Sequence, residues 1–140
     1  MGKILCAIRG GEEGYRTQDA AITLARERGD DLCFLCILDL SFMGRWGGPD
    51  TPDTRGALAQ VGQFLLTRAA ERARQAGIEA RMLLREGQLR EQIKAAAREE
   101  GVTTVILGRP QGRYDMFASA DLEEFARQIQ SEIGIEIRIE

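Results

Sequence analysis

The 140-residue sequence contains no histidine. A Ser-His-Asp triad and a histidine general base are therefore excluded, and so are most zinc sites. Basic charge is not in excess either, since 19 Lys and Arg residues stand against 22 Asp and Glu residues, for a net charge of −3. Proteins that bind nucleic acids or anionic membranes usually present strongly basic surfaces, so we expect neither partner.

Long hydrophobic runs are also missing. Only five apolar residues lie between Lys3 and Arg9, which is too few for the core of a signal peptide. No later run approaches the roughly 20 apolar residues that a membrane span needs. Position 6 holds Cys6, whereas a myristoylation signal requires Ser or Thr there. We therefore expect a cytoplasmic protein.

Cysteine is scarce, and the three that are present lie in apolar runs: Cys6, Cys33 and Cys36. The Cys33-x-x-Cys36 spacing is typical of redox or zinc motifs. On a strand, however, residues three apart point to opposite faces. The sequence therefore predicts three buried thiols in a reducing compartment and no metal site.

One pattern recurs four times along the chain. A charged helix end is followed by a glycine and then by an apolar or alternating segment, and the glycines are Gly29, Gly77, Gly101 and Gly134. Glycine just past a helix end is the usual left-handed cap, and the segments after it have the composition of strands. Together with the apolar run at residues 4–8, they predict five strands.

Helical periods separate these strands. Apolar residues three and four apart mark four helices, and they are Ala21, Leu24 and Ala25; Leu58, Val61, Leu65, Ala69 and Ala73; Leu89, Ile93, Ala96 and Ala97; Leu122, Phe125, Ala126, Ile129 and Ile133. Asp121, with Glu124 three residues later, predicts a capping box at the start of the last helix. The glycine- and proline-rich stretch 39–56 predicts a long loop.

Strict alternation of strands and helices predicts one α/β domain over residues 1–140. We expect a doubly wound, five-stranded parallel sheet in the order 3-2-1-4-5 with helices on both faces. In this order the direction reverses between the first and fourth strands, where doubly wound folds bind their ligands. The loops that would contact a ligand are therefore residues 9–14 and 108–120.

Two long segments carry a resemblance to a known family. The segment KILCAIRGGEEGYRTQDAAITLARERGDDLCFLCILD is similar to an opening strand, loop, alanine-rich helix and second strand of the universal stress protein family. The segment REGQLREQIKAAAREEGVTTVILGRPQGR resembles its third helix and the strand that runs into a glycine loop. The resemblance implies an adenine-nucleotide-type fold, a role in the stress response, and a homodimer.

The ligand motif of the family is altered in this chain. In ATP-binding members the first strand ends in an aspartate, and here that position holds Arg9. Gly108 matches the first glycine of the family's phosphate loop, but the second glycine position holds Gln111, with Gly112 one place late. The final Gly-Ser or Gly-Thr pair falls on Asp121 and Leu122 or, if the loop is shortened, nearest to Ala118 and Ser119. The resemblance therefore implies that ATP is not bound in the usual family mode.

Arginines offer a different ligand chemistry at the same place. Arg9, Arg109 and Arg113 could converge on a crevice that fits a carboxylate or a phosphate. The candidate ligand-binding residues are Arg9, Gly10, Gly11, Asp39, Gly108, Arg109, Gly112 and Arg113. The alternative is that Arg9 pairs with Glu12, Glu13 or Asp39, and binds no ligand. Tyr15 either stacks on a base or packs over the end of the sheet.

Several functions remain open. We favour a non-catalytic binding or regulatory module that holds a small anion, with no metal and no cofactor. ATP or another nucleotide bound through altered contacts is the alternative within this class. A different class is an enzyme that transfers or hydrolyses phosphate, in which Asp39 and Asp115 would hold Mg²⁺. The third class is a purely structural dimerisation domain.

The tail IGIEIRIE predicts the dimer interface. Isoleucines alternate with polar residues, which is the pattern of a strand with one apolar face. As the fifth strand it would lie at the edge of the sheet, and edges of this kind pair with other chains. The predicted interface residues are Ile135, Glu136, Ile137, Arg138 and Ile139. In a two-fold antiparallel pair centred on Ile137, Glu136 faces Arg138 twice.

Overall fold

The computed structural model describes residues 2–8, 12–38, 52–108 and 119–140. Strands and helices alternate along these segments, as the sequence predicts. In chain order the elements are β1 (Lys3–Ala7), α1 (Glu12–Arg28), β2 (Asp31–Leu38), α3 (Pro52–Gln75), β3 (Ala80–Glu86), α4 (Leu89–Glu99), β4 (Thr104–Leu107), α5 (Ser119–Ile133) and β5 (Glu136–Ile139).

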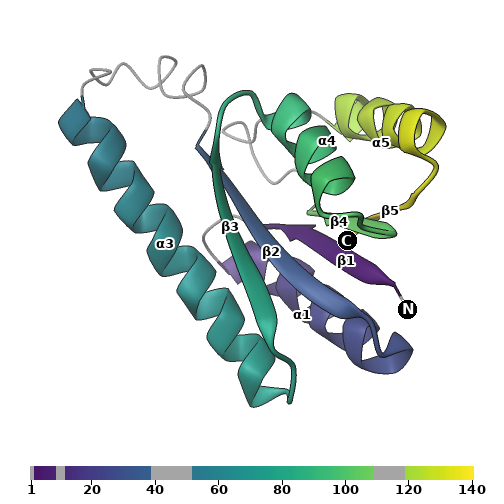
Figure 1. Ribbon diagram of the computed structural model, residues 1–140, viewed down its shortest axis with the longest axis horizontal. Coiled ribbons are helices and arrows are strands. Elements are labelled where there is room, and N and C mark those ends of the chain that lie inside the picture. The colour runs from purple at the N-terminus through teal and green to yellow at the C-terminus, as the bar shows by residue number, and fades with distance from the viewer. Residues whose placement is uncertain (1, 9–11, 39–51, 109–118) are drawn as a thin grey trace.

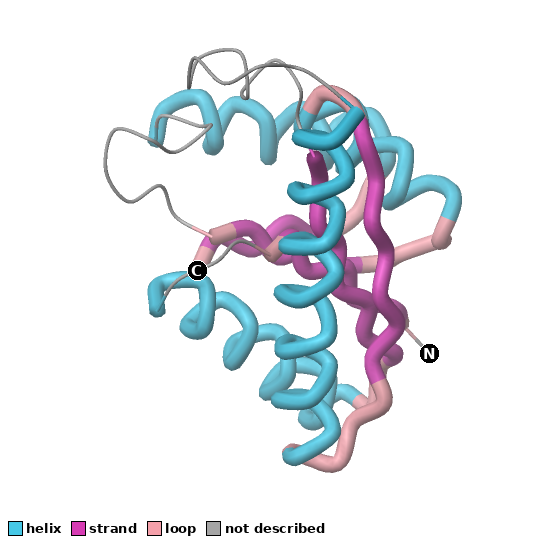
Figure 2. Tube along the Cα trace, turned by 90° about the vertical axis from the view of Figure 1, so that its left-hand side faces the viewer, coloured by secondary structure: helices cyan, strands magenta, loops and turns pink. Residues whose placement is uncertain are grey.

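The strands form one parallel sheet in the order β3-β2-β1-β4-β5, which confirms the predicted topology. β1 lies in the middle, where Cys6 is level with Phe34 of β2 and with Ile106 of β4. Helices α1 and α3 pack on one face, and α4 and α5 pack on the other (Figures 1 and 2). The predicted arrangement with helices on both faces is therefore confirmed.

Glycine residues make the turns from helices into strands. Each of the four predicted glycines has a positive φ angle: 67° at Gly29, 85° at Gly77, 63° at Gly101 and 75° at Gly134. A residue with a Cβ rarely adopts this conformation. Glycine therefore ends each helix and redirects the chain without the steric strain that another residue would have. These positions were correctly predicted because the cap depends on local backbone geometry alone.

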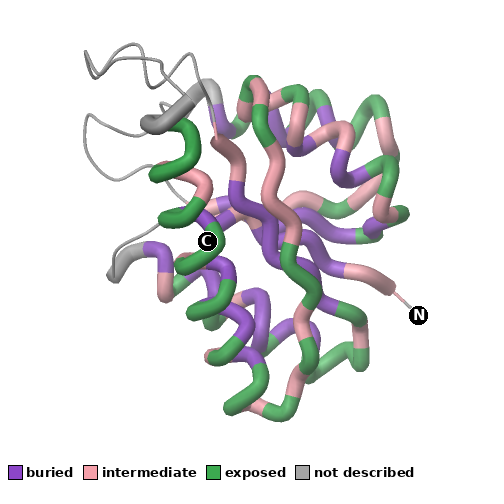
Figure 3. The backbone as a smooth tube through the Cα atoms, turned by 60° about the vertical axis from the view of Figure 1, so that its left-hand side comes forward, coloured by how far each residue is buried: buried purple, intermediate pink, exposed green. Residues whose placement is uncertain are grey.

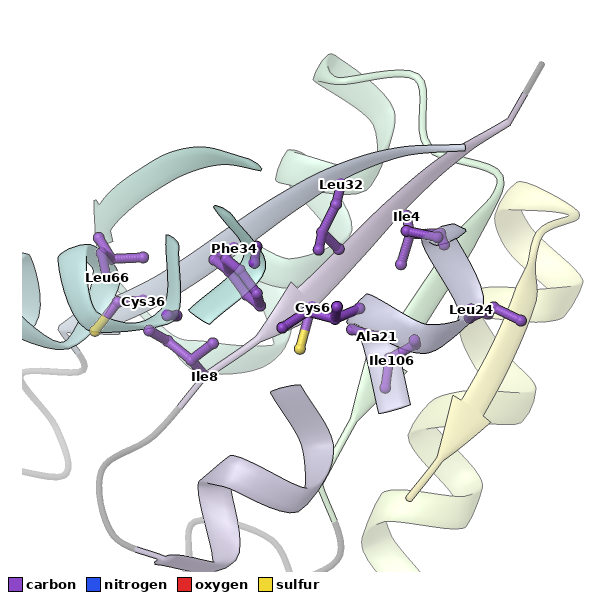
Figure 4. Close-up of a cluster of buried hydrophobic side chains, with 14 residues drawn as sticks. Ile4, Cys6, Ile8, Ala21, Leu24, Leu32, Phe34, Cys36, Leu66 and Ile106 are labelled. Atoms are coloured by element: carbon purple, nitrogen blue, oxygen red, sulfur yellow. The ribbon is translucent and has the colours of Figure 1, made fainter. Parts of the chain in front are cut away.

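Two hydrophobic clusters hold the helices against the sheet. Successive residues of β1 enter different clusters, because side chains alternate along a strand. Ile4 and Cys6 join α1 and α3 in the first cluster, and Leu5 joins α4 and α5 in the second. Figure 3 shows the central strands as the most continuously buried part of the chain, and Figure 4 shows the first cluster around Cys6 and Phe34.

The predicted loop at residues 39–56 is too long. Helix α3 begins at Pro52, so residues 52–56 are helical. Proline lacks an N–H group and has a fixed φ angle, and both properties suit the first turn of a helix. The earlier part of this stretch, residues 39–51 with Trp46, lies outside the described residues.

The buried face of α3 differs from the face that the apolar period predicts. Val61 was expected in the core, but 53% of its surface is exposed. The buried line instead passes through Gly62 and Leu66. A Cβ atom on Gly62 would lie 2.9 Å from Leu84 Cδ1, so the missing side chain lets the helix approach the sheet closely. A pattern of apolar residues does not detect a contact face centred on glycine.

The predicted capping box at Asp121 is wrong. Helix α5 begins at Ser119, so Asp121 lies inside the first turn instead of at the N-cap. Boundaries inferred from a periodic pattern often err by one or two residues, because the pattern marks the buried face and not the helix end.

The burial of Phe34 predicts a large stability difference between two matched variants. Phe34 is fully buried in the first cluster, whereas Phe64 on α3 is 61% exposed. We expect Phe34→Ala to lower the free energy of unfolding by about 3–5 kcal/mol, because it leaves a cavity. Phe64→Ala should change it by less than about 0.5 kcal/mol. Urea denaturation followed by circular dichroism measures both, and equal losses would contradict the assigned core.

Candidate functional site

The candidate ligand site lies where the strand order reverses. β1 and β4 are neighbours, with Ile4 level with Thr104 and Cys6 level with Ile106. The chain leaves β1 after Ile8, whose N–H donates to the carbonyl of Leu35 at 2.8 Å. It leaves β4 at the half-buried Gly108. Both connections therefore start from adjacent points at the carboxyl edge of the sheet, as predicted.

The structure describes one of the predicted ligand-binding residues, at the point where the chain leaves β4. Of the eight candidates, Gly108 is described, and seven lie outside the described residues: Arg9, Gly10, Gly11, Asp39, Arg109, Gly112 and Arg113. The convergence of the arginines and the alternative ion pairs of Arg9 therefore both stay predictions.

The first turns of α1 border the carboxyl edge. Tyr15 was a candidate for stacking on a base, but its ring lies under the guanidinium of Arg72 from α3, 4.4 Å from its centre. Arg72 also forms an ion pair with Asp19. These contacts join α1 to α3, and the Tyr15 ring stacks on an arginine within the chain.

Two polar residues of α1 are buried next to the sheet. Thr17 and Gln18 are 4% and 3% exposed, and the carbonyl of Thr17 accepts a weak bond from the Cys6 thiol at 4.0 Å. The side-chain oxygen of Gln18 has no hydrogen-bond partner among the residues that the structure describes. Sequence reasoning favoured a helix-surface position for Thr17, which is wrong, and did not single out Gln18, because a helical period identifies the buried face only through its apolar members.

Helix α4 also starts at the carboxyl edge. The N–H of Gly87 donates to the carbonyl of Leu38 at 3.0 Å, which brings the helix start beside the end of β2. The N-cap residue Gln88 makes no side-chain capping bond, and the acidic Glu91 in the first turn interacts favourably with the positive end of the helix. Nearby, the Arg90 guanidinium lies 5.7 Å from the centre of the Phe125 ring.

The cysteines have the predicted structural role. Cys33 packs in the cluster under α4 and α5, and Cys36 packs in the opposite cluster. Burial raises the pKa of the Cys33 thiol to about 11 and also raises the pKa values of Cys6 and Cys36. Thiols in this state are poor nucleophiles and poor metal ligands. Within the described residues no group of three or more acidic or cysteine side chains could hold a metal ion.

The second predicted site is the edge strand β5. Ile135, Ile137 and Ile139 pack against the cluster under α4 and α5. The intervening residues, Glu136 and Arg138, therefore lie on the face that α1 covers. The prediction that this strand lies at the sheet edge with one apolar face is confirmed.

Arg28 at the end of α1 reaches Glu136 on this face. Its Nη1 atom donates to Glu136 Oε1 at 2.8 Å, and Thr104 Oγ1 donates to the same oxygen at 3.0 Å. The Arg28 hydrogen bond lowers the pKa of Glu136 below its ordinary value, and the Thr104 bond acts in the same direction. Sequence reasoning missed Arg28, because 108 residues separate it from Glu136.

Comparison with known proteins agrees with this geometry. A family model described as the universal stress protein family matches residues 1–119. The chain belongs to the universal stress protein family. In the described segments, none of the helices is long and apolar enough to cross a membrane.

Relatives of the universal stress protein type cover most of the chain. Universal stress protein YxiE of Bacillus subtilis is 27% identical over an alignment of 116 residues, and the match covers 77% of this chain and 78% of YxiE. A crystal structure from Burkholderia pseudomallei has a TM-score of 0.71 at 20% identity, and the match covers 99% of this chain and 95% of that one. The Archaeoglobus fulgidus universal stress protein in complex with dAMP has a TM-score of 0.66 at 20% identity, over 99% and 97% of the chains.

Proposed function

We propose that this universal stress protein is a non-catalytic binding or regulatory module of the stress response, which binds a small anion or a nucleotide phosphate group. The observation that carries the proposal is the reversal of strand order between β1 and β4. Because of this reversal, chain segments 9–11 and 109–113 follow the ends of two adjacent strands, and both segments contain arginine. The dAMP complex of the Archaeoglobus fulgidus relative supports a phosphate-bearing ligand, and doubly wound folds bind ligands at the carboxyl edge.

The proposed ligand is not ATP in the usual family mode. Arg9 replaces the aspartate expected after the first strand, and Gln111 replaces a glycine of the phosphate loop. Asp121 occupies the position of the final glycine pair and lies in the first turn of α5. A carboxylate there interacts favourably with the helix dipole and competes with a phosphate for the same positive end.

A binding role is favoured over phosphoryl transfer, because neither Asp39 nor Asp115 lies in a recognised metal-binding motif. Enzymatic phosphoryl transfer requires metal-binding oxygens and a positioned cation. Asp39 and Asp115, the candidate metal ligands for that alternative, lie outside the described residues. A cytoplasmic location is part of the proposal, because three free buried thiols suit a reducing compartment.

The proposed partner is a second copy of the chain, bound through β5. The strand is exposed along one edge and carries an isoleucine face that continues the α4 and α5 cluster. Two such edges in antiparallel pairing would join the two sheets into one.

The first prediction for this function concerns ATP. Titration calorimetry with Mg-ATP should give negligible heat at concentrations that saturate a relative with an intact motif, because Arg9, Gln111 and Asp121 replace the motif residues. Saturable binding with the adenine beside β1 would contradict this part of the proposal and favour the nucleotide-binding alternative.

A second prediction concerns the arginines of the crevice. Phosphate should raise the melting temperature of the wild-type protein, since a ligand that binds only the folded state stabilises it. Arg9→Ala and Arg109→Ala should each reduce this shift, whereas Arg26→Ala on the exposed surface of α1 should preserve it. Differential scanning fluorimetry measures the shift. If both crevice variants keep the full shift, the anion site is wrong.

A third prediction concerns the edge strand. Arg138→Glu places a carboxylate opposite Glu136 of the second copy in the register centred on Ile137. Two favourable cross-strand pairs become repulsive, so association should weaken by at least about 1 kcal/mol, or roughly fivefold in Kd. Sedimentation velocity over a dilution series measures Kd. A wild-type monomer at high concentration, or an unchanged Kd in the variant, would rule out this interface.

A further inference from the structure

The charges around Glu136 are paired unequally within the subunit. Oxygen Oε1 accepts from Arg28 Nη1 at 2.8 Å and from Thr104 Oγ1 at 3.0 Å. Among the described residues, oxygen Oε2 has only longer contacts, to Arg28 Nη2 at 3.4 Å and to Arg138 Nη1 at 3.9 Å. Arg28 therefore binds both carboxylate oxygens, Oε1 closely and Oε2 through a longer hydrogen bond, and Oε2 keeps the capacity to accept from a further donor.

Arg138 is paired even more loosely. Its Nε atom is 3.6 Å from Glu140 Oε1, and its contact with Glu136 is the 3.9 Å one. Ion pairs of this length between exposed side chains contribute little to stability. The guanidinium can therefore turn to another carboxylate at small cost.

The backbone hydrogen-bonding groups of β5 point alternately toward β4 and toward the open edge of the sheet. Glu136 and Glu140 donate their N–H groups inward, to the carbonyls of Thr103 and Leu107. Because alternate residues of a strand turn their backbone groups to opposite sides, those of Ile137 and Ile139 point outward. An antiparallel strand centred on Ile137 would exchange hydrogen bonds at these outward residues and set Glu136 close to Arg138 of the second copy.

We infer that Arg28 is a positioning residue for the β5 edge. By holding Glu136 in place, Arg28 makes this edge complementary to the same edge of a second copy of the chain. The inference rests on the dimer proposed above. Arg28 holds Glu136 so that Oε2 can accept from Arg138 of the second copy, on the face that α1 covers.

Arg28 also balances the charge of the edge. Arg28 and Arg138 together neutralise Glu136 and Glu140, so the four side chains of one copy carry no net charge. Without Arg28, each copy would present one excess negative charge to the other. The edge would then repel its own copy, although no residue of the strand itself had changed.

Two neighbouring arginines of α1 allow a matched test. Arg28→Gln removes the charge that holds Glu136, and Arg26→Gln removes an exposed charge from the same helical turn. Because the effect occurs once in each copy, Arg28→Gln should raise Kd about 3- to 30-fold, and Arg26→Gln should leave it within about twofold. Added salt should partly restore association of Arg28→Gln by screening the excess charge. Circular dichroism verifies that both variants are folded.

Exchanging the charges at positions 136 and 138 tests whether Arg28 positions Glu136 or only stabilises its own subunit. Glu136→Arg and Arg138→Glu should each self-associate poorly, because like charges then face each other. Mixed together, they should form a heterodimer in which opposite charges again face each other across the interface. In that heterodimer Arg28 of the Glu136→Arg chain has no carboxylate at position 136 to hold, so adding Arg28→Gln to this chain in high salt, where the long-range charges are screened, should leave Kd within about twofold.

The outcomes distinguish the two proposals. A wild-type monomer would overturn the proposed dimer and this inference with it. A wild-type dimer whose Kd is the same in Arg28→Gln would overturn the role of Arg28 alone. A heterodimer that Arg28→Gln weakens in high salt would show that Arg28 acts through the stability of its own subunit and would also overturn the inference.

Discussion

The burial of β1 on both faces is the constraint on which the rest of the structure depends. Ile4, Leu5 and Cys6 are consecutive and fully buried, and they enter two different clusters. A parallel strand of this kind lies inside a sheet that helices cover on both sides. With β1 central, the chain adds β2 and β3 on one side and β4 and β5 on the other. The same constraint therefore creates both the reversal of strand order between β1 and β4, where the ligand is proposed to bind, and the sheet edge at β5.

The fold could be predicted from the sequence because its signals are local and agree with one another. Glycine caps such as Gly29 and Gly77 depend on a single φ angle, and the apolar runs that follow them admit few alternatives to a parallel strand. The errors arose where tertiary packing determines which face of a helix contacts the sheet. The contact face of α3 is centred on Gly62, and a residue without a side chain gives no signal in a hydrophobic period.

The candidate sites were predictable to a smaller extent. The place of the crevice follows from the topology, whereas its ligand depends on side-chain positions of residues such as Arg9, which the pattern of the sequence does not determine. The edge strand was predictable from the alternation in its own residues. Its support by Arg28 was not, because that ion pair forms only after α1 and β5 have packed on the sheet. Tyr15 illustrates the same limit, since its partner Arg72 lies on another helix.

The sheet has two edges, and their charges explain why the partner is assigned to β5. β3 is the longer edge strand, with seven residues against four. Its arginines are already engaged, since Arg81 pairs with Glu100 at 2.6 Å and Arg85 pairs with Glu99. A second chain at β3 would gain no ion pair from these arginines without losing one. On β5, Arg138 has contacts of 3.6 Å and longer within the described part of the chain, so pairing across the proposed interface would give up little within the subunit. This difference is the reason for proposing β5, and not β3, as the edge at which two copies associate.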